Sequence, residues 1–363
     1  MARWLRIGIA VALVALVAAC GGGDDKDSGA KATPQAGGAT QVAQATQAAP
    51  QVKGSLTVYN ALDQTTIDAM EAAFKKKYPD VNVNVLGVAA AGETATRIRA
   101  EKDAPKADIF IGGDTAFHEG LAKDGLTLAY KSPVASQIDA KYYDPEGRWY
   151  GWYIGVLGIV INTDRFKDAK VAEPKTWDDL LDPAWKGKLA FPNPTTTGGG
   201  YIFLADQVFR FNQDEAKAMD FMKKLDGNVA QYTQRSPDAI NIVARGEFVA
   251  AMNWVHDILV QKKLGFPLKV IIPPDTAYEV GGVSIIKGGG NPEAAKAFLD
   301  WTLGAEAGKI NSDNSNRLSV RSDVPAPEGA VKLSDVKLVN YDRDFATKEK
   351  DRLLKAWQTA TGK

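Results

Sequence analysis

The sequence has 363 residues, of which 45% are hydrophobic, and its 44 basic side chains are balanced by 44 acidic ones. A chain without an excess of positive charge lacks a general attraction for nucleic acid, so we expect no nucleic-acid partner. The single cysteine excludes an intramolecular disulfide and any metal site that needs several cysteines.

The N-terminus has the features of a secretory signal. A positively charged start precedes the apolar segment 7–19, which is too short to span a bilayer as a stable helix. The segment ends in VAAC, residues 17–20, which resembles the lipobox of bacterial lipoproteins. This resemblance implies that residues 1–19 are removed and that lipid is attached to Cys20, in the periplasm or on the outer face of the cell membrane. An ordinary signal peptide with a chance cysteine is the alternative.

Residues 20–53 predict a flexible, lipid-anchored linker. They are rich in Gly, Ala, Gln and Thr and contain no aromatic residue. Such a segment cannot bury enough apolar surface to offset the entropy that it would lose on ordering. The remaining chain, residues 54–363, is longer than one comfortable hydrophobic core and therefore predicts two lobes.

The first part of the folded region alternates short β-branched runs with helical patterns. Strand and helix are predicted to alternate at 55–62, 65–79, 81–88, 89–103, 107–113 and 114–125. Ile67, Met70 and Phe74 fall on one face of the first helix, and period-2 alternation marks the second strand. This order predicts a parallel sheet with helices on both faces, with ligands bound beyond the carboxyl ends of the strands.

The middle of the chain changes character. Residues 148–163 are first aromatic and then apolar, which predicts strands that leave the first lobe. A second set of strands and helices is predicted at 188–194, 200–211, 214–228, 236–247 and 248–254. Residues 267–288 should return to the first lobe and precede a helix pair at 291–311. A last helix, 347–361, is expected to pack on the first lobe with a solvated outer face.

One turn has unusual chemistry. FPNPTTTGGGYIF, residues 191–203, places three threonines and three glycines after an apolar segment. Glycine permits close backbone approach, and a strand-to-helix turn leaves amide groups available to an anion. No lysine follows the glycines, so the segment is not a P-loop. The pattern favours an anion site, and a glycine-rich surface turn is the alternative.

Six strings of the sequence carry a resemblance to a known family. They are LTVYNALD (56–63), KADIFIGGDTAFHEGLAKDGL (106–126), GWYIGVLGIVINTD (151–164), TWDDLLDPAWKGKLAFPNPTTTGGG (176–200), VARGEFVAAMNWVHD (243–257) and YEVGGVSIIKGGGNPEAAKAFLDW (278–301). In these strings, which keep the family's order, the chain resembles the solute-binding proteins of bacterial ABC importers. The similar branch contains the ferric-ion-binding and 2-aminoethylphosphonate-binding proteins.

The resemblance implies an α/β chain with the two-lobe periplasmic-binding-protein fold of type II. Each lobe would hold a mainly parallel sheet flanked by helices, and two β crossovers would form the hinge. Lobe one would comprise residues 54–155 and 269–363, and lobe two residues 156–268. A ligand would be held in the cleft, and the lobes would close on it.

The threonine–glycine turn would lie in this cleft together with four further loops. The ligand-binding candidates are Ala61, Leu62, Gly113, Asp114, Thr115, Thr195, Thr196, Thr197, Gly198, Arg235, Ser236, Trp254, His256, Asp257, Tyr278 and Glu279. The hydroxyl and amide donors suit phosphate, phosphonate or carboxylate, and Arg235 suits an anion. Glu279 suits an ammonium group. The expected ligand is therefore small and anionic or zwitterionic, such as 2-aminoethylphosphonate or a phosphate ester.

Several candidates have structural alternatives. Asp114 and Asp257 are residue types that cap helices, and Arg235 could be an ordinary solvated side chain. Glu279 could instead pin the hinge by a hydrogen bond. His118 falls within a short helix and is expected on the surface.

Ferric iron is the alternative ligand. The ferric branch of the resembling family has two adjacent tyrosines where this sequence has Val255 and His256, and valine cannot ligate a metal. An iron site would have to use scattered tyrosines, of which Tyr59, Tyr153, Tyr201 and Tyr278 are candidates. Otherwise we expect neither a metal nor a cofactor.

The resemblance implies a non-enzymatic receptor that captures a solute outside the cytoplasm and delivers it to an ABC permease and its ATPase. We expect a monomer that is held at the membrane through Cys20. An extracellular hydrolase is the alternative of another class, but the sequence has neither a GxSxG elbow nor an HExxH motif. A sensory binding module is the third alternative.

Overall fold

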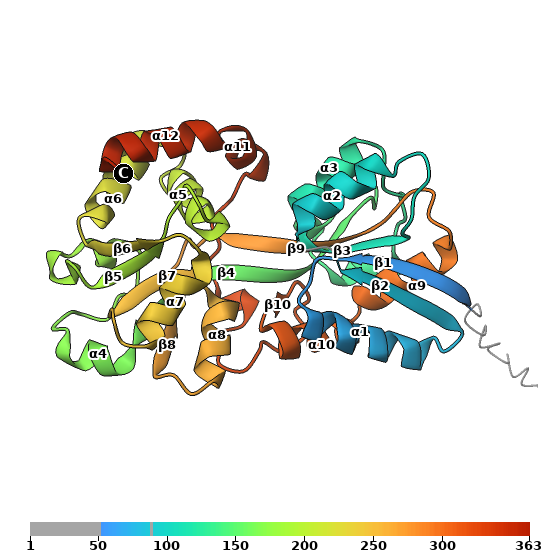
Figure 1. The fold of residues 1–363 in the computed structure, drawn as a ribbon, viewed down its shortest axis with the longest axis horizontal. Helices are drawn as coiled ribbons and strands as arrows, with labels where there is room; N and C mark the ends of the chain where they lie inside the picture. The colour runs from blue at the N-terminus through green and yellow to red at the C-terminus, as the bar shows by residue number, and fades with distance from the viewer. Residues whose placement is uncertain (1–51, 88–89) are drawn as a thin grey trace, which may run out of the picture. The chain divides into compact units, whose positions relative to one another are not determined.

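The computed structural model describes residues 52–87 and 90–363, which are drawn in colour in Figure 1. The predicted signal peptide, Cys20 and nearly all of the predicted linker lie outside these residues. Within the described ranges, no helix combines the length and the apolar character needed to cross a membrane.

The first lobe begins with three parallel strands in the order β2-β1-β3. These strands are β1 (Gly54–Asn60), β2 (Val81–Gly87) and β3 (Ile109–Asp114). They alternate with three helices, α1 (Gln64–Lys77), α2 (Ala91–Ala100) and α3 (Thr115–Lys123). Asp63 caps α1 by accepting a hydrogen bond of 2.9 Å from the Thr66 amide, and Ile67, Met70 and Phe74 of this helix are buried. The predicted order of strands and helices is confirmed here.

Two crossovers connect the lobes. Strand β4 (Tyr150–Asn162) is buried along all of its 13 residues. Its first half pairs with β9 (Tyr278–Ile285), whereas its second half pairs with β7 (Ala250–Trp254) and β8 (Leu268–Ile271). We expected several strands in this region, but one strand forms because each lobe offers hydrogen-bond partners to half of it. The chain returns between β8 and β9, so both crossovers lie side by side (Figure 1).

The second lobe continues the sheet in the order β4-β7-β5-β6. Its further strands are β5 (Leu189–Pro192) and β6 (Val229–Thr233), and β5 is parallel to both of its neighbours. The helices of this lobe are α4 (Thr163–Asp168), α5 (Gly198–Arg210), α6 (Glu215–Asp226), α7 (Ser236–Ala244) and α8 (Val255–Lys263). The parallel βα units place the strand ends and helix starts at one edge of the sheet, where the sequence predicts the site.

After β9 the chain completes the first lobe and then leaves it again. The remaining elements are α9 (Pro292–Thr302), α10 (Ala305–Ser315), β10 (Leu318–Ser319), α11 (Arg343–Lys348) and α12 (Lys350–Thr361). Short 3-10 helices occur at Pro133–Gln137, Ala140–Tyr142, Asp178–Leu181, Pro183–Trp185 and Leu333–Asp335. Strand β10 pairs with β4, and Leu338 bridges Thr276 beside the second crossover.

Helix α12 packs on the second lobe, against α5 and α6, so the expectation that it packs on the first lobe was wrong. Trp357 is fully buried, and its ring meets Tyr232 edge-on with centroids 5.6 Å apart. Arg352 forms an ion pair of 2.6 Å with Glu215 of α6. Periodicity identified the helix and its apolar face, but periodicity carries no information about which lobe covers that face.

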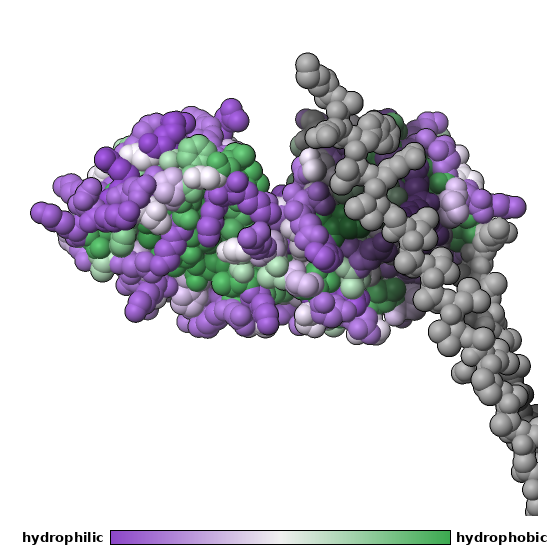
Figure 2. Space-filling model, turned by 90° about the horizontal axis from the view of Figure 1, so that it is seen from below, coloured by the Kyte–Doolittle hydropathy of each residue, from purple (hydrophilic) through white to green (hydrophobic). Residues whose placement is uncertain are grey.

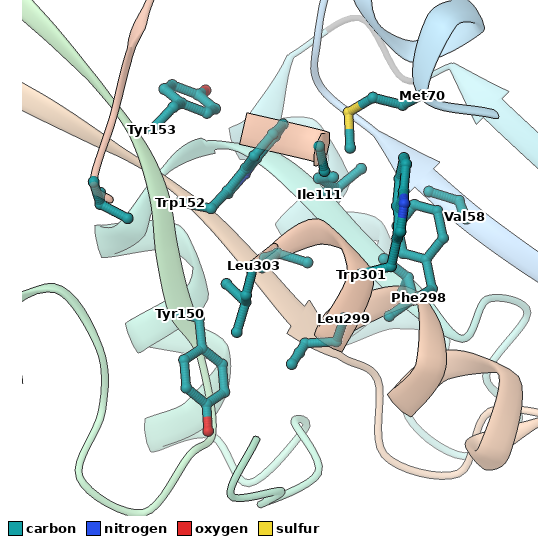
Figure 3. Close-up of a cluster of buried hydrophobic side chains, with 14 of the residues drawn as sticks. Val58, Met70, Ile111, Tyr150, Trp152, Tyr153, Phe298, Leu299, Trp301 and Leu303 are labelled. Carbon is teal, nitrogen blue, oxygen red and sulfur yellow. The ribbon is translucent and has the colours of Figure 1, made fainter. Parts of the chain in front are cut away.

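Each lobe has its own hydrophobic core. In the first lobe, Trp152 of β4 lies among side chains that include Met70 and Ile111 (Figure 3). In the second lobe, Trp177 packs edge-on against Phe203, with ring centroids 4.9 Å apart. Hydrophilic residues cover most of the face shown in Figure 2, with hydrophobic residues visible between them. Strand β4 contributes to both cores, with Trp152 in the first and Leu157 in the second.

Candidate functional site

The threonine–glycine turn connects β5 to α5. Asn193 organises it, because its Oδ1 accepts hydrogen bonds of 2.8 Å from both the amide and the hydroxyl of Thr195. Thr197 is the N-cap of α5, and its Oγ1 accepts a hydrogen bond of 3.0 Å from an amide of the first turn. Thr196 and Gly198 are exposed. The first amides of a helix have no acceptor within it, so the turn offers donors to an anion.

Trp254 lies beside this turn, where β7 ends and α8 begins. A Cβ added at Gly199 would lie 3.2 Å from Trp254 Nε1 and 3.4 Å from Ser236 Oγ. The missing side chain at Gly199 thus makes room for both groups. Asn253 connects the two loops, since its side-chain amide donates to the Ser236 carbonyl. The structure therefore brings Ser236 and Trp254 to the threonine–glycine turn.

The first turn of α8 carries two further candidates. The His256 ring stacks on Trp254 with centroids 5.8 Å apart, and His256 Nε2 lies 3.6 Å from Asp257 Oδ1. The His256 side chain is 6% exposed, whereas the Asp257 side chain keeps 38% of its surface accessible. Asp257 therefore offers an accessible carboxylate next to a buried imidazole.

Glu279 reaches the same place from β9, where it is the partner of Gly155 in β4. A Cβ added at Gly155 would lie 2.8 Å from Glu279 Oε1 and 3.1 Å from His256 Cε1. Gly155 thus provides the space in which the carboxylate of Glu279 and the ring of His256 meet.

Arg317 adds a cation to this group. Its Nε lies 3.6 Å from Glu279 Oε1, and its guanidinium stands over the Tyr153 ring, 5.2 Å from the centroid. The Arg317 and Glu279 side chains each keep 22% of their surface accessible. We call Tyr153, His256, Asp257, Glu279 and Arg317 the crossover cluster.

Burial changes the protonation of the crossover cluster. It raises the pKa of the Glu279 carboxyl, which the charge of Arg317 opposes. It also raises the pKa of Asp257, again against the charge of Arg317. Burial, followed by the charge of Arg317, holds the pKa of His256 well below its usual value. His256 is therefore neutral at neutral pH, and Arg317 supplies the positive charge beside the two carboxylates.

The third part of the site lies at the start of α3. Asp114 caps this helix by accepting a hydrogen bond of 2.8 Å from an amide of the first turn. Arg343 of α11 donates to Thr115 Oγ1 at 2.9 Å and lies 3.8 Å from Asp114 Oδ2. Its guanidinium also stands over the Tyr278 ring, 5.6 Å from the centroid. Because α11 packs against α5, Arg343 connects the second lobe to the first.

The remaining candidates adjoin these groups. Gly113 has a φ of 76°, and a Cβ there would lie 2.1 Å from the Ala91 Cβ, so only glycine fits this turn. Ala61 and Leu62 lie against Gly112, where an added Cβ would come within 2.8 Å of the Ala61 carbonyl carbon. Arg235 is exposed at the N-cap position of α7, and its guanidinium has no ion-pair partner in the described part of the chain.

Two of the four tyrosines considered for iron are engaged elsewhere. Tyr59 is fully buried, and its hydroxyl donates to Glu101 at 2.7 Å. Burial and this hydrogen bond raise its pKa to about 12, which disfavours the phenolate that iron requires. The Tyr201 hydroxyl donates to the Ala346 carbonyl. Tyr153 and Tyr278 lie at the site, each with an arginine guanidinium over its ring. Across residues 52–87 and 90–363, no group of three or more His, Cys, Asp and Glu side chains could hold a metal ion.

His118 was expected on the surface, and this expectation was wrong. It is fully buried, and its ring stacks on Phe110 with centroids 4.1 Å apart. Its Nδ1 and Nε2 lie 2.9 Å from Ser284 Oγ and 3.0 Å from the Gly112 carbonyl oxygen. Burial lowers its pKa to about 4. The sequence of α3 did not reveal that β9 covers this face of the helix.

Sequence reasoning missed Arg317 and Arg343. Arg317 follows α10 and Arg343 begins α11, and neither lies in a recognisable motif. At both positions the sequence shows only an arginine near the end of a helix, and such arginines are common on protein surfaces. Their partners are distant in the chain, so only the fold identifies them.

Replacing Gly155 by alanine is expected to disturb the crossover cluster. The added methyl would overlap the Glu279 carboxylate and crowd His256, which should cost about 1–3 kcal/mol of stability. Chemical unfolding would measure this loss. Gly87→Ala is the matched control, because a Cβ there meets nothing within 4 Å. Equal stability of both variants would contradict the packing described here.

Known proteins resemble this chain in sequence and in fold. Residues 104–349 match the model of a family described as bacterial extracellular solute-binding protein. An uncharacterized protein of Haemophilus influenzae is 33% identical over 315 residues, which cover 84% of this chain and 90% of that protein. A putative 2-aminoethylphosphonate-binding periplasmic protein of Salmonella typhi is 24% identical over 255 residues, 68% of this chain and 72% of that protein.

A similar solved structure is the periplasmic binding protein AfuA from Actinobacillus pleuropneumoniae, with exogenous fructose 6-phosphate bound. The TM-score is 0.68 at 32% identity, and the match covers 85% of this chain and 99% of that one. The expected type II periplasmic-binding-protein fold is thereby confirmed.

Proposed function

The chain belongs to the family of bacterial extracellular solute-binding proteins, and we propose that its solute is a small phosphate ester that carries hydroxyl groups. As a periplasmic solute-binding protein of an ABC importer, the chain holds a solute outside the cytoplasm and presents it to a permease. One observation carries the proposal: hydrogen-bond donors gather at one part of the site, and carboxylate acceptors at another.

The donors lie at the start of α5. The partial positive charge of a helix N-terminus favours an anion, and the first turn of α5 contains no acidic residue. Trp254 Nε1 and the Ser236 hydroxyl stand beside Gly199 and add two donors. A phosphate group, whose several oxygens accept hydrogen bonds and which as a dianion needs no acceptor partner, fits this part of the site.

The acceptors belong to the crossover cluster. Asp257 and Glu279 present accessible carboxylates, and a neutral His256 accompanies them. Carboxylates accept hydrogen bonds from hydroxyl groups, and such charge-assisted bonds are stronger than bonds between neutral groups. Fructose 6-phosphate, the compound bound in the similar AfuA structure, carries a phosphate and several hydroxyl groups in one molecule.

The proposal also covers the membrane anchor, the oligomeric state and the protein partners of the receptor. Cys20, which lies outside the described residues, would carry the lipid that anchors the chain at the membrane surface. The chain would act as a monomer that binds without a catalytic step or a cofactor, and its partners would be a permease and an ATPase. Ferric iron is disfavoured because two of the four tyrosines considered for it are engaged in other contacts.

A ligand screen tests the proposal. The full chain, stripped of ligand by unfolding and refolding, would be heated with fructose 6-phosphate, fructose, inorganic phosphate, 2-aminoethylphosphonate or ferric citrate. A ligand at 100-fold over its Kd stabilises a protein by about 2.7 kcal/mol, which moves Tm by several degrees. We expect the largest shift with fructose 6-phosphate and little shift with fructose. A shift with ferric citrate alone, or no shift with any phosphorylated compound, would refute the proposal.

Acid should weaken binding. Burial raises the pKa of Glu279 and Asp257, so both carboxylates take up protons at a higher pH than exposed carboxyls do and then no longer accept as strongly. Affinity for fructose 6-phosphate, measured by titration calorimetry from about pH 7 to about pH 5, is expected to fall. Acid has the opposite effect on the folding stability of the ligand-free protein. The folded state holds these protons more tightly than the unfolded chain, so acidification through the same range stabilises the fold at these residues.

Protonation of the ligand's phosphate also lowers affinity in this range, so a control is needed. Glu279→Gln removes one titrating carboxyl but leaves the ligand unchanged, and its affinity should depend less on pH. An identical pH dependence in both proteins would assign the effect to the ligand alone.

A further inference from the structure

Arg317 stands between the two carboxylates and the aromatic face of the crossover cluster. Its Nε is 3.6 Å from Glu279 Oε1, and its guanidinium lies over the Tyr153 ring at 5.2 Å from the centroid. Its charge also acts on Asp257. The buried Nε–H has no hydrogen-bond acceptor among the described residues.

We propose that Arg317 determines which ligands the acceptor part of the site takes: it excludes those with an ammonium group and admits those with neutral hydroxyl groups. The proposal rests on the function proposed above and narrows its substrate class to hydroxylated phosphate esters without an ammonium group. Without Arg317, the two carboxylates would attract an ammonium group.

Two features of the geometry oppose an ammonium ligand. The positive charge of Arg317 repels a second cation beside Glu279, and this repulsion is strong in a partly buried site where water screens poorly. The face of Tyr153, which would otherwise attract a cation, is already covered by the guanidinium. A neutral hydroxyl group is not subject to this repulsion and can still donate to Asp257 or Glu279.

The backbone around Arg317 holds this residue in place. Asn316 ends α10 in the left-handed conformation with a φ of 57°, and its Oδ1 accepts a hydrogen bond from Lys263 Nζ. Lys263 is the last residue of α8, the helix whose first turn carries His256 and Asp257. The Arg317 carbonyl accepts from the Ser312 hydroxyl at 2.9 Å. One network thus fixes the cation relative to the helix that carries Asp257.

The test compares two ligands on the full chain and its variants. Titration calorimetry would give the Kd of fructose 6-phosphate and of 2-aminoethylphosphonate, and the ratio of the two is the specificity. The native protein should bind fructose 6-phosphate more tightly. In Arg317→Met the ratio should shift toward 2-aminoethylphosphonate by at least about tenfold, because the repulsion is gone. Arg317→Lys keeps the charge and should shift the ratio much less.

The outcomes separate the two proposals. Binding of neither ligand by the native protein would overturn the proposed function. Binding of fructose 6-phosphate with an unchanged ratio in Arg317→Met would overturn the role of Arg317 and leave the proposed function standing. Circular dichroism would establish that each variant folds, and Arg317→Gln, which is neutral but polar, replaces the methionine variant if that one does not fold.

Discussion

Replacing Asp257 by asparagine and Glu279 by glutamine together is expected to weaken fructose 6-phosphate binding by at least about 100-fold. A hydrogen bond to a charged group contributes about 1.5–3 kcal/mol, and two such acceptors lose their charge in this variant. The amides keep the shape of the carboxyl groups, so the packing around Gly155 and His256 should persist. Titration calorimetry on the full chain would measure the loss.

A surface variant controls for the change of charge. Glu293 lies on α9 and pairs with Lys296 of the same helix, with 72% of its side-chain surface accessible. Glu293→Gln should bind as the native protein does. Native affinity in the double variant would show that the crossover cluster does not contact the ligand and that the acceptor part of the site was assigned incorrectly.

Replacing Trp357 by alanine is expected to cost about 3–5 kcal/mol of folding stability. The indole is fully buried between α12 and the second lobe, where its ring meets Tyr232. Truncation would leave a cavity at the contact that holds the C-terminal helix. Urea unfolding, followed by the circular dichroism of the full chain, would show the loss as a lower midpoint.

Two substitutions test the reason for this loss. Trp357→Phe should cost much less, because the indole Nε1 has no hydrogen-bond partner in the described part of the chain and only volume is removed. Gln358→Ala changes an exposed neighbour on the same helix and should be nearly neutral. If Trp357→Ala were as stable as Gln358→Ala, α12 would not be held by the packing described here.

Much of the fold could be predicted because its determinants are local. Helix α1 has a cap at Asp63 and an apolar face with helical period, and both are contained in one short stretch of chain. The turn of Thr197 was identified in the same way, since its three glycines and the N-cap threonine are adjacent. The alternation of strands and helices then led to parallel sheets and to their carboxyl ends.

The sequence predicted the residues of the acceptor part of the site only incompletely. His256, Asp257 and Glu279 were named because each follows or occupies a strand that the resemblance placed at the cleft. Their arrangement around Gly155 depends on the pairing of β4 with β9, which the sequence does not state. Arg317 joins them from a segment without any motif.

The sequence by itself determined the order of most strands and helices and, with the resemblance, the two-lobe α/β fold. The tertiary structure alone decided that α12 covers the second lobe, that His118 is buried and that Arg343 and Arg317 enter the site. The physical reason is the same in each case. Capping and periodicity act between residues a few positions apart, whereas the partners of these groups lie far away in the chain, such as Thr115 for Arg343, at a separation of 228 residues.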